Sequence, residues 1–369
     1  MKIVLPLVIT MLLFCCQPKP ESKLAKEVDL LFSEEFKETE PGGAILIMKG
    51  EKIIFSKGYG LADLNTKEKI TTQTLFNTGS ISKTFVSNVV LELADEGKLS
   101  VLDSLDKYFP DFKNKSIAQQ VQIHHLLTHT SGLPDNRWKL LSEAFLLTAK
   151  DEENFAPIML NDSLLFEPGS QFEYSNPAFN GLALIIEKIE GKKWQSVIAE
   201  KIFKPAGMVN SLITDGRFPD KGVSHAYVNK DGQWKELDYG EEPTFAASGN
   251  GGVWSSVEEL AKYEIALRKS VFLKKETIER SRTITTYENW KSKEPPFIGF
   301  SWFLSQPSDF IKIVSHTGSQ GGFSSDYVSI PEKEIIYVLL CNRPEPIMDL
   351  RKKVLASLKK YNWLNNFYH

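Results

Sequence analysis

Cysteine is scarce in this chain, which has three among its 369 residues. Cys15 and Cys16 are adjacent near the N-terminus, and Cys341 directly follows the apolar run 335–340. Three cysteines in these positions cannot form a framework of disulfides, so we expect a fold that does not depend on them. Cys341 is expected to be a buried strand residue that packs as a small apolar side chain.

An excess of one charge and long apolar runs are also missing. The 44 basic and 47 acidic residues give a net charge of −3, and no run of Lys or Arg alternates with aromatic residues. This argues against a nucleic-acid partner. The apolar run 3–14 is shorter than a membrane span requires. The glycine-containing run 249–252 lacks the following Lys-Ser/Thr of a nucleotide site and is expected to be a loop.

The first 22 residues differ in composition from the rest of the chain. Lys2, the apolar run and the two cysteines predict a signal peptide over residues 1–16, followed by a polar tether over residues 17–22. A leucine three positions before each cysteine resembles a bacterial lipobox, which implies lipidation of Cys15 or Cys16. A plain cleaved secretory signal is the alternative. In both cases we expect an exported protein, attached to a membrane only if the cysteine carries a lipid.

The hydrophobic periodicity predicts an α+β fold. Helical spacing marks residues 24–36 and 348–360, and helices and loops fill most of the middle of the chain. Strands are predicted at both ends, at 43–48, 53–59, 300–304, 311–314, 322–329 and 334–340. We therefore expect one antiparallel sheet built from both chain ends and flanked by helices. Residues 23–79 and 255–369 would form this sheet lobe, and residues 80–254 an inserted, mostly helical lobe.

The pattern Ser-x-x-Lys occurs three times, at Ser80–Lys83, Ser104–Lys107 and Ser357–Lys360. The second lies in a polar stretch that ends in proline, and the third on the polar side of a basic helix. Ser80 instead opens a segment with apolar residues at helical spacing until Gly97. At a helix N-terminus the macrodipole favours negative charge on an attacked carbonyl, and a partly desolvated Lys83 could act as the base. The alternative is an N-cap serine without catalytic function.

Two later motifs can supply a proton relay and a substrate-binding edge. Tyr174-Ser175-Asn176 follows a turn, so its phenol could be a phenolate or pass a proton to and from Ser80, and its amide could bind a carbonyl. The same Tyr-x-Asn pattern occurs at Tyr227 and Tyr287, and a core tyrosine before an Asn-Pro turn is the alternative. His316-Thr317-Gly318 is predicted to end a strand, where glycine lets a substrate backbone approach. A strand that simply ends in a turn is the alternative.

In this order the three motifs resemble the penicillin-recognising serine hydrolase superfamily, in its class C β-lactamase-like branch. The stretches 125–134, 203–208 and 248–253 also resemble that branch, and the similarity extends over residues 42–343. The resemblance implies a β-lactamase/D,D-peptidase-like fold. It makes Ser80 the acylated nucleophile, Lys83 its base and Tyr174 the proton shuttle. Asn176 would bind substrate or orient Lys83, and Thr317 and Gly318 would line the substrate. The backbone N–H groups of Ser80 and Ser319 would form the oxyanion hole.

His316 departs from the lysine that β-lactamases and D,D-peptidases usually carry to attract a substrate carboxylate. An imidazole is mostly neutral near pH 7, which favours the esterases and the D-amino-acid amidases or peptidases of the superfamily. A β-lactamase or D,D-carboxypeptidase, and an inactive cell-wall binder on the same fold, are the alternatives.

We expect a small-molecule or peptide substrate and no organic cofactor. The sequence does not indicate an oligomeric state. His125 and His129 have metal-ligand spacing on a helix, but no third ligand is evident, so we expect no metal.

Overall fold

The computed structural model describes residues 20–136, 151–214, 219–237, 248–306 and 311–364. The predicted signal peptide and both candidate lipidation cysteines, Cys15 and Cys16, lie outside these residues. The predicted tether 17–22 lies partly inside them and is corrected there, because Pro20–Glu35 forms helix α1. Proline is well tolerated in the first turn of a helix, and Glu21 places a favourable acid in that turn.

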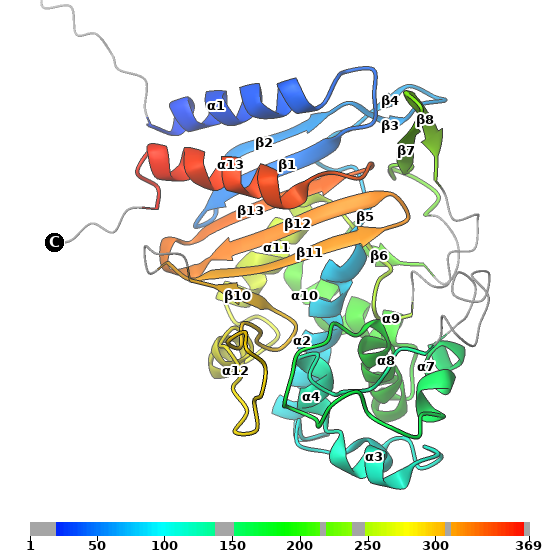
Figure 1. The fold of residues 1–369 in the computed structure, drawn as a ribbon. Helices are drawn as coiled ribbons and strands as arrows, with labels where there is room; N and C mark the ends of the chain where they lie inside the picture. The colour runs from blue at the N-terminus through cyan, green and yellow to red at the C-terminus, as the bar shows by residue number, and fades with distance from the viewer. Residues whose placement is uncertain (1–19, 137–150, 215–218, 238–247, 307–310, 365–369) are drawn as a thin grey trace, which may run out of the picture.

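The main sheet has six antiparallel strands in the order β10-β11-β12-β13-β1-β2. Both chain ends contribute to it, as the sequence predicts (Figure 1). Its strands are β1 (Gly43–Lys49), β2 (Lys52–Tyr59), β10 (Phe303–Ser305), β11 (Ile313–Gln320), β12 (Phe323–Ile330) and β13 (Ile335–Cys341). Shorter strands form small sheets beside it: β3 (Leu61–Asp63), β4 (Glu68–Lys69), β5 (Phe76–Asn77), β6 (Leu212–Ile213), β7 (Tyr227–Lys230), β8 (Gln233–Glu236) and β9 (Val253–Ser255).

The helices cover both faces of the main sheet. Those besides α1 are α2 (Ser82–Asp95), α3 (Lys115–Gln120), α4 (Ile123–Leu127), α7 (Asp151–Met159), α8 (Asn176–Glu190), α9 (Trp194–Ile198), α10 (Lys204–Ala206), α11 (Val257–Arg268), α12 (Lys275–Ser281) and α13 (Ile347–Lys360). Figure 1 shows α1 and α13 side by side on one face, while α2 and α11 lie on the other. No helix among the described residues combines the length and the apolar character needed to cross a bilayer.

The sheet separates two hydrophobic cores. Successive side chains of β1 point to opposite faces, so Ala44 and Leu46 join the core formed with α2, α8 and α11. Ile45 and Ile47 join the core under α1 and α13. Cys341 is buried in this second core, as predicted. Burial on both faces explains why β1 and β13 read as nearly continuous apolar runs in the sequence.

Candidate active site

Ser80 lies in a 3₁₀ turn, Gly79–Ile81, that leads directly into α2. The sequence predicted Ser80 at the N-terminus of the helix, but the α-helix begins two residues later. Hydrogen bonds hold this turn against the sheets. The Thr78 N–H donates to the carbonyl of Val253 over 2.9 Å, and the Ser325 hydroxyl donates to the carbonyl of Thr78 over 2.8 Å. The position of Ser80 is therefore set by two strands that are far apart in sequence.

Lys83 is wholly buried one turn after Ser80. Its Nζ lies 3.1 Å from Ser80 Oγ and donates to the backbone carbonyl of Asn250 over 2.7 Å. Nζ also lies 5.0 Å from the ring centroid of Tyr174 and 5.8 Å from that of Phe179. The amine is thus held within hydrogen-bond reach of the serine hydroxyl, which is the geometry that a general base requires.

The Asn250 carbonyl is a functional group that sequence reasoning did not identify. The side-chain amide of Asn180, on α8, donates to the carbonyl of Ser248 over 2.6 Å. The Ser248 hydroxyl donates to Asn250 Oδ1 over 2.9 Å. These bonds fix the loop that presents the carbonyl to Lys83. In the sequence, the stretch 248–253 resembles the superfamily, but this resemblance does not show that the Asn250 carbonyl contacts Lys83.

Tyr174 comes just before α8 and lines the same cavity as Ser80. The residue exposes 38% of its surface to the cavity, but its hydroxyl end is buried, and this burial raises the pKa of Tyr174 well above its usual value. The phenol is therefore neutral near pH 7, which favours a proton shuttle over a phenolate. The other two candidates lie elsewhere: the Tyr227 hydroxyl accepts from the Leu64 N–H, and Tyr287 contacts Thr128.

The strand β11 is longer than the sequence predicted. His316-Thr317-Gly318 was expected to end a strand, but β11 continues to Gln320 because its pairing with β12 continues to Phe323. The chain reverses only at Gly321 and Gly322, both with positive φ. Since β10 pairs with residues 313–315, the following part of β11 faces the cavity.

Gly318 is required for close approach and not for a turn. A Cβ at this position would lie 2.1 Å from the carbonyl oxygen of Thr78 and 3.0 Å from the backbone nitrogen of Ser80. A Cβ on Gly79 would likewise lie 2.8 Å from the backbone nitrogen of Ser319. The two glycines therefore let β11 lie directly against the Ser80 turn. The oxyanion hole formed by the N–H groups of Ser80 and Ser319 stays a prediction that this close approach favours.

His316 is almost wholly buried beside the other candidate residues. Its Nδ1 lies 2.6 Å from the carbonyl of Thr317, and because a carbonyl only accepts, Nδ1 carries the proton. Burial and the nearby Lys83 lower the pKa of His316 to about 3. The imidazole is neutral near pH 7, so the position usually occupied by lysine carries no positive charge.

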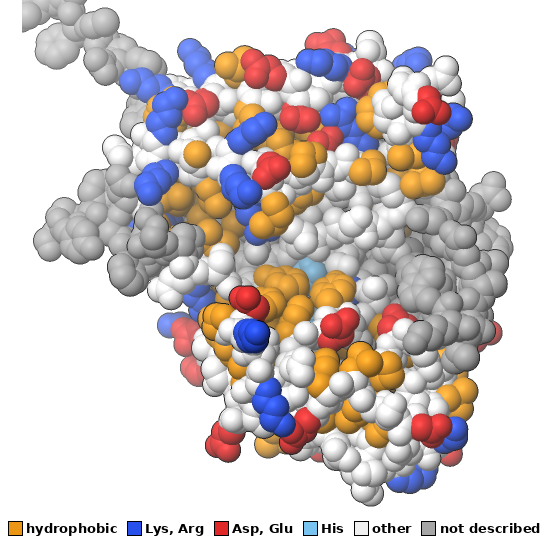
Figure 2. Space-filling model, viewed as in Figure 1, with side chains coloured by type: hydrophobic (Ala, Val, Ile, Leu, Met, Phe, Trp, Pro, Cys, Tyr) orange, Lys and Arg blue, Asp and Glu red, His pale blue; other side chains and the backbone are white. Residues whose placement is uncertain are grey.

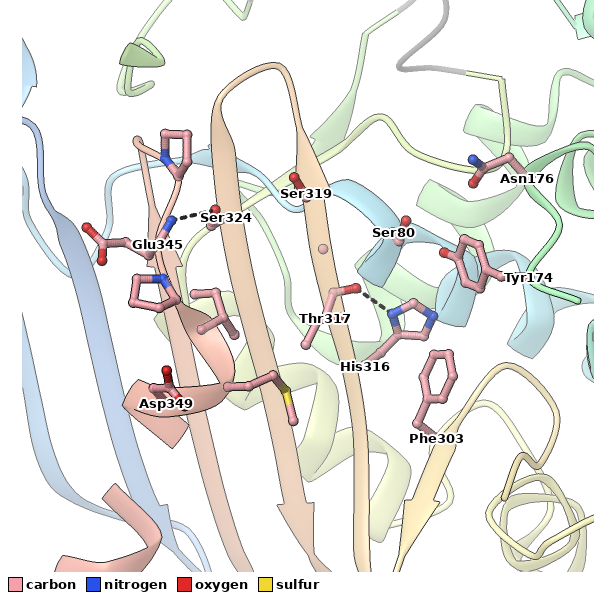
Figure 3. A pocket seen from close by; sticks show the side chains of 15 residues that line it. Ser80, Tyr174, Asn176, Phe303, His316, Thr317, Ser319, Ser324, Glu345 and Asp349 are labelled. Carbon is pink, nitrogen blue, oxygen red and sulfur yellow. Dashed lines mark hydrogen bonds between the residues drawn. The ribbon is translucent and has the colours of Figure 1, made fainter. Parts of the chain in front are cut away.

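Ser80, Tyr174, Asn176 and His316 line one cavity of about 730 Å³, a volume typical of small-molecule sites. Figure 2 shows hydrophobic side chains gathered around the hollow between the sheet and the helices, with a histidine visible in it. In Figure 3, Ser80, Tyr174 and Asn176 lie on one side, and His316 points toward Tyr174. The far end of the cavity is formed by residues 344–349, a segment that nothing in the sequence marked as part of the site. Thr317, Gly318 and Ser319 also line it, as predicted.

Three other sequence candidates, Ser104, Ser357 and His125, do not line this cavity. Ser104 donates to Asp106, and Ser357 donates to Glu27, both through their hydroxyls. His125 lies in α4 and accepts from the Gln122 N–H, whereas His129 follows the end of that helix. Within the residues that the structure describes, no three His, Cys, Asp or Glu side chains are grouped as a metal site would require.

Comparison with known proteins gives consistent matches. The family model described as Beta-lactamase matches residues 28–359. Penicillin-binding protein 4* of Bacillus subtilis (strain 168) is 27% identical over 332 residues, which are 87% of this chain and 72% of that protein. The chain spans less of the protein flp from Staphylococcus aureus (strain NCTC 8325 / PS 47): it is 30% identical over 206 residues, 55% of this chain and 41% of flp.

Two solved structures have the same fold. The octameric penicillin-binding protein homologue from Pyrococcus abyssi superposes with a TM-score of 0.77 at 28% identity, covering 93% of this chain and 78% of that one. The D-amino acid amidase from Ochrobactrum anthropi SV3, complexed with L-phenylalanine amide, superposes with a TM-score of 0.75 at 21% identity. That match covers 92% of this chain and 99% of the amidase, and at this identity it supports the fold alone.

Proposed function

The chain belongs to the beta-lactamase family of serine hydrolases, and we propose that it cleaves ester or amide substrates through a covalent acyl-enzyme on Ser80. The observation that carries the proposal is the contact between a wholly buried Lys83 amine and the Ser80 hydroxyl, at 3.1 Å. A serine next to such an amine can be deprotonated as it attacks, without a histidine.

The proposed acylation begins with the Lys83 amine in its neutral, unprotonated form. Its nitrogen takes the proton of the Ser80 hydroxyl while Oγ bonds to the substrate carbonyl carbon, and the backbone N–H groups of Ser80 and Ser319 stabilise the oxyanion. The bond to the leaving group then breaks. The leaving group takes a proton from the neutral Tyr174 phenol, and the Lys83 ammonium returns a proton to Tyr174.

Deacylation would reverse these roles with water as the nucleophile. Tyr174 passes the water proton to Lys83 while the water oxygen bonds to the acyl carbon. The ester bond to Ser80 then breaks, Ser80 regains a proton, and a carboxylic acid leaves. The two half-reactions together consume one water and need no cofactor.

The substrate class follows from His316. Because burial holds its pKa at about 3, this residue offers no positive charge to a substrate carboxylate near pH 7. We therefore place the substrates among small esters, D-amino-acid amides and peptides, which need no such charge at the reacting acyl group.

Labelling with a fluorophosphonate tests the proposal. The wild-type protein should be labelled at Ser80, and Ser80→Ala should not be labelled. Ser104→Ala and Ser357→Ala remove the same hydroxyl from the other two quartets and should be labelled like the wild type. A folded wild-type protein that resists labelling would refute the enzyme and favour the non-catalytic cell-wall binder.

The second candidate is a β-lactamase or D,D-carboxypeptidase, favoured by the similarity to penicillin-binding protein 4* over 87% of the chain. It predicts faster turnover of a chromogenic cephalosporin than of short acyl esters, and our proposal predicts the opposite order. His316→Lys should improve turnover of carboxylate-bearing substrates. If it does not, the argument from the neutral imidazole is wrong.

We also propose that the protein is exported and carries a lipid on Cys15 or Cys16. The composition of residues 1–22 supports this. When the producing bacteria are grown with an alkyne fatty acid, the full chain should be labelled. One of the two substitutions, Cys15→Ser or Cys16→Ser, should abolish the label and so identify the lipidated cysteine. Export without any label would leave the plain secretory signal as the correct interpretation.

A further inference from the structure

His129 is a wholly buried residue beside the candidate active site, with no role in the chemistry proposed so far. It follows α4, and its backbone φ of 55° lies in the left-handed region that residues other than glycine seldom adopt. Such a conformation costs free energy and persists only where the surroundings hold it. Hydrogen bonds to the segment that carries Tyr174 hold His129 in this conformation.

His129 binds the chain on both sides of Tyr174. The Glu173 N–H donates to the carbonyl oxygen of His129 over 2.9 Å, and the Ser175 N–H donates to His129 Nδ1 over 2.9 Å. The imidazole also stacks on the Tyr174 ring, with the centroids 4.4 Å apart and the planes 23° from parallel. Phe179, which contacts Lys83, lies 5.1 Å from the imidazole centroid. The imidazole thus contacts the Tyr174 ring and the backbone N–H of the next residue, Ser175.

The tautomer of His129 supports a specific role for its Nδ1 atom. Because Nδ1 accepts from the Ser175 N–H, the ring proton lies on Nε2. Among the residues that the structure describes, this buried Nε2 has no hydrogen-bond partner. A buried donor without a partner destabilises the fold, and a phenylalanine could fill the same space without that cost. The hydrogen bond that Nδ1 accepts is the property that phenylalanine lacks.

We propose that His129 is a positioning residue that holds the Tyr174 phenol against Ser80, where it donates its proton to the leaving group. This inference rests on the proposed function, because it assigns His129 to the proton transfer of that mechanism. A displacement of about 1 Å from the productive position lowers a rate by roughly 100-fold. A loosened Tyr174 should therefore slow the reactions that need its proton and spare those that do not.

Two esters of the same acyl group separate these cases. An ethyl ester loses a basic alkoxide that must be protonated, whereas a p-nitrophenyl ester loses a stable phenolate that leaves without a proton. In single-turnover acylation we expect His129→Leu to slow the ethyl ester by about 10- to 100-fold. The p-nitrophenyl ester should change by less than about 3-fold. Lys83→Met should slow both esters and serves as the reference for a lost base.

His129→Asn is the matched variant, because asparagine Oδ1 occupies the place of Nδ1 in a side chain shaped like that of leucine. It should bring the ratio of the two acylation rates back to within about 3-fold of the wild type. A purely structural role predicts that each variant loses rate equally on both esters, and that His129→Leu loses more than His129→Asn because leucine is strained at the φ of 55°. If His129→Leu does not fold, His129→Phe keeps the stacked ring without the acceptor and should show the same separation of the two esters.

Equal losses on both esters, or no loss in a folded His129→Leu, would overturn the role of His129 and leave the proposed function intact. A wild-type protein that releases p-nitrophenol no faster than Ser80→Ala in the single-turnover assay would overturn the proposed function and this inference with it. Thermal unfolding of each variant shows whether the rates were measured on folded protein.

Discussion

Two of the Ser-x-x-Lys quartets share their spacing but differ in their surroundings. Ser80–Lys83 spans a 3₁₀ turn and the first residues of α2, whereas Ser357–Lys360 ends α13. In the second quartet both side chains bind the Glu27 carboxylate. The Ser357 hydroxyl donates to it over 2.9 Å and the exposed Lys360 amine over 2.5 Å. The hydrogen bond to Glu27 raises the pKa of Lys360, which keeps the amine protonated.

The first quartet has another environment. The Lys83 amine is wholly buried and contacts a hydroxyl, a backbone carbonyl and an aromatic ring. Helical spacing brings a serine and a lysine together in both quartets, but the neighbouring groups decide whether the amine can accept a proton. A four-residue motif therefore becomes chemical evidence only after the residues around it have been identified.

The largest effect should come from removing the two amines. Lys83→Met eliminates the proposed base and should lower kcat/KM for an acyl ester by roughly 1000-fold, within the range attributed to general bases. Lys360→Met removes an amine already held as an ammonium and should leave kcat/KM unchanged. Steady-state kinetics on both variants measures the contrast. Comparable activity of Lys83→Met and wild type would mean that another group activates Ser80.

Much of this contrast could be predicted from the sequence, because Ser80 opens an apolar-spaced segment whereas Ser357 was expected on the polar side of a basic helix. The structure buries Ser357 against Glu27 instead. The order of Tyr174 and His316 along the chain then indicated one site. The Asn250 carbonyl could not be predicted, since every residue type carries a backbone carbonyl. The extent of β11 was missed because Gly318 reads as a strand end, although its tertiary role is to admit the Ser80 turn.

The second-largest effect should be a loss of folding stability in acidic solution, caused by His316, which lies near Lys83. The pKa of His316 is about 3 in the folded protein and about 6.5 when unfolded, so the unfolded chain binds a proton that the folded chain excludes. Its neutral form thus stabilises the fold fully above pH 6.5, and this contribution is lost as the pH falls from 6.5 toward 3. Below pH 5.5 the loss is about 1.4 kcal/mol per pH unit.

Denaturant unfolding at pH 6.5, 5.5 and 4.5 measures this slope. His316→Gln should flatten it by about that amount, because glutamine does not titrate. Glu27 belongs to the other quartet, and its pKa is lowered below the usual value by the hydrogen bond from Lys360. Its contribution is lost only in more acidic solution, so Glu27→Gln should leave the slope between pH 6.5 and 5.5 unchanged. Parallel curves for wild type and His316→Gln would contradict the assignment.

The smallest effect should come from Glu27→Gln at neutral pH. The substitution removes the charge that Lys360 contacts. Ser357 and Tyr361 donate to different carboxylate oxygens of Glu27, over 2.9 and 2.8 Å, so the amide oxygen can still accept from one hydroxyl while the amide N–H donates to the other. Exposed ion pairs contribute little to stability, so Tm should fall by no more than about 2 °C, and less in high salt. Fluorophosphonate labelling of Ser80 should keep its wild-type rate, because Glu27 lies in α1 on one face of the main sheet and Ser80 lies on the opposite face, at the cavity. A slower labelling rate in Glu27→Gln would show that the two quartets are coupled through the sheet, and the comparison between an inert and a reactive quartet would then fail.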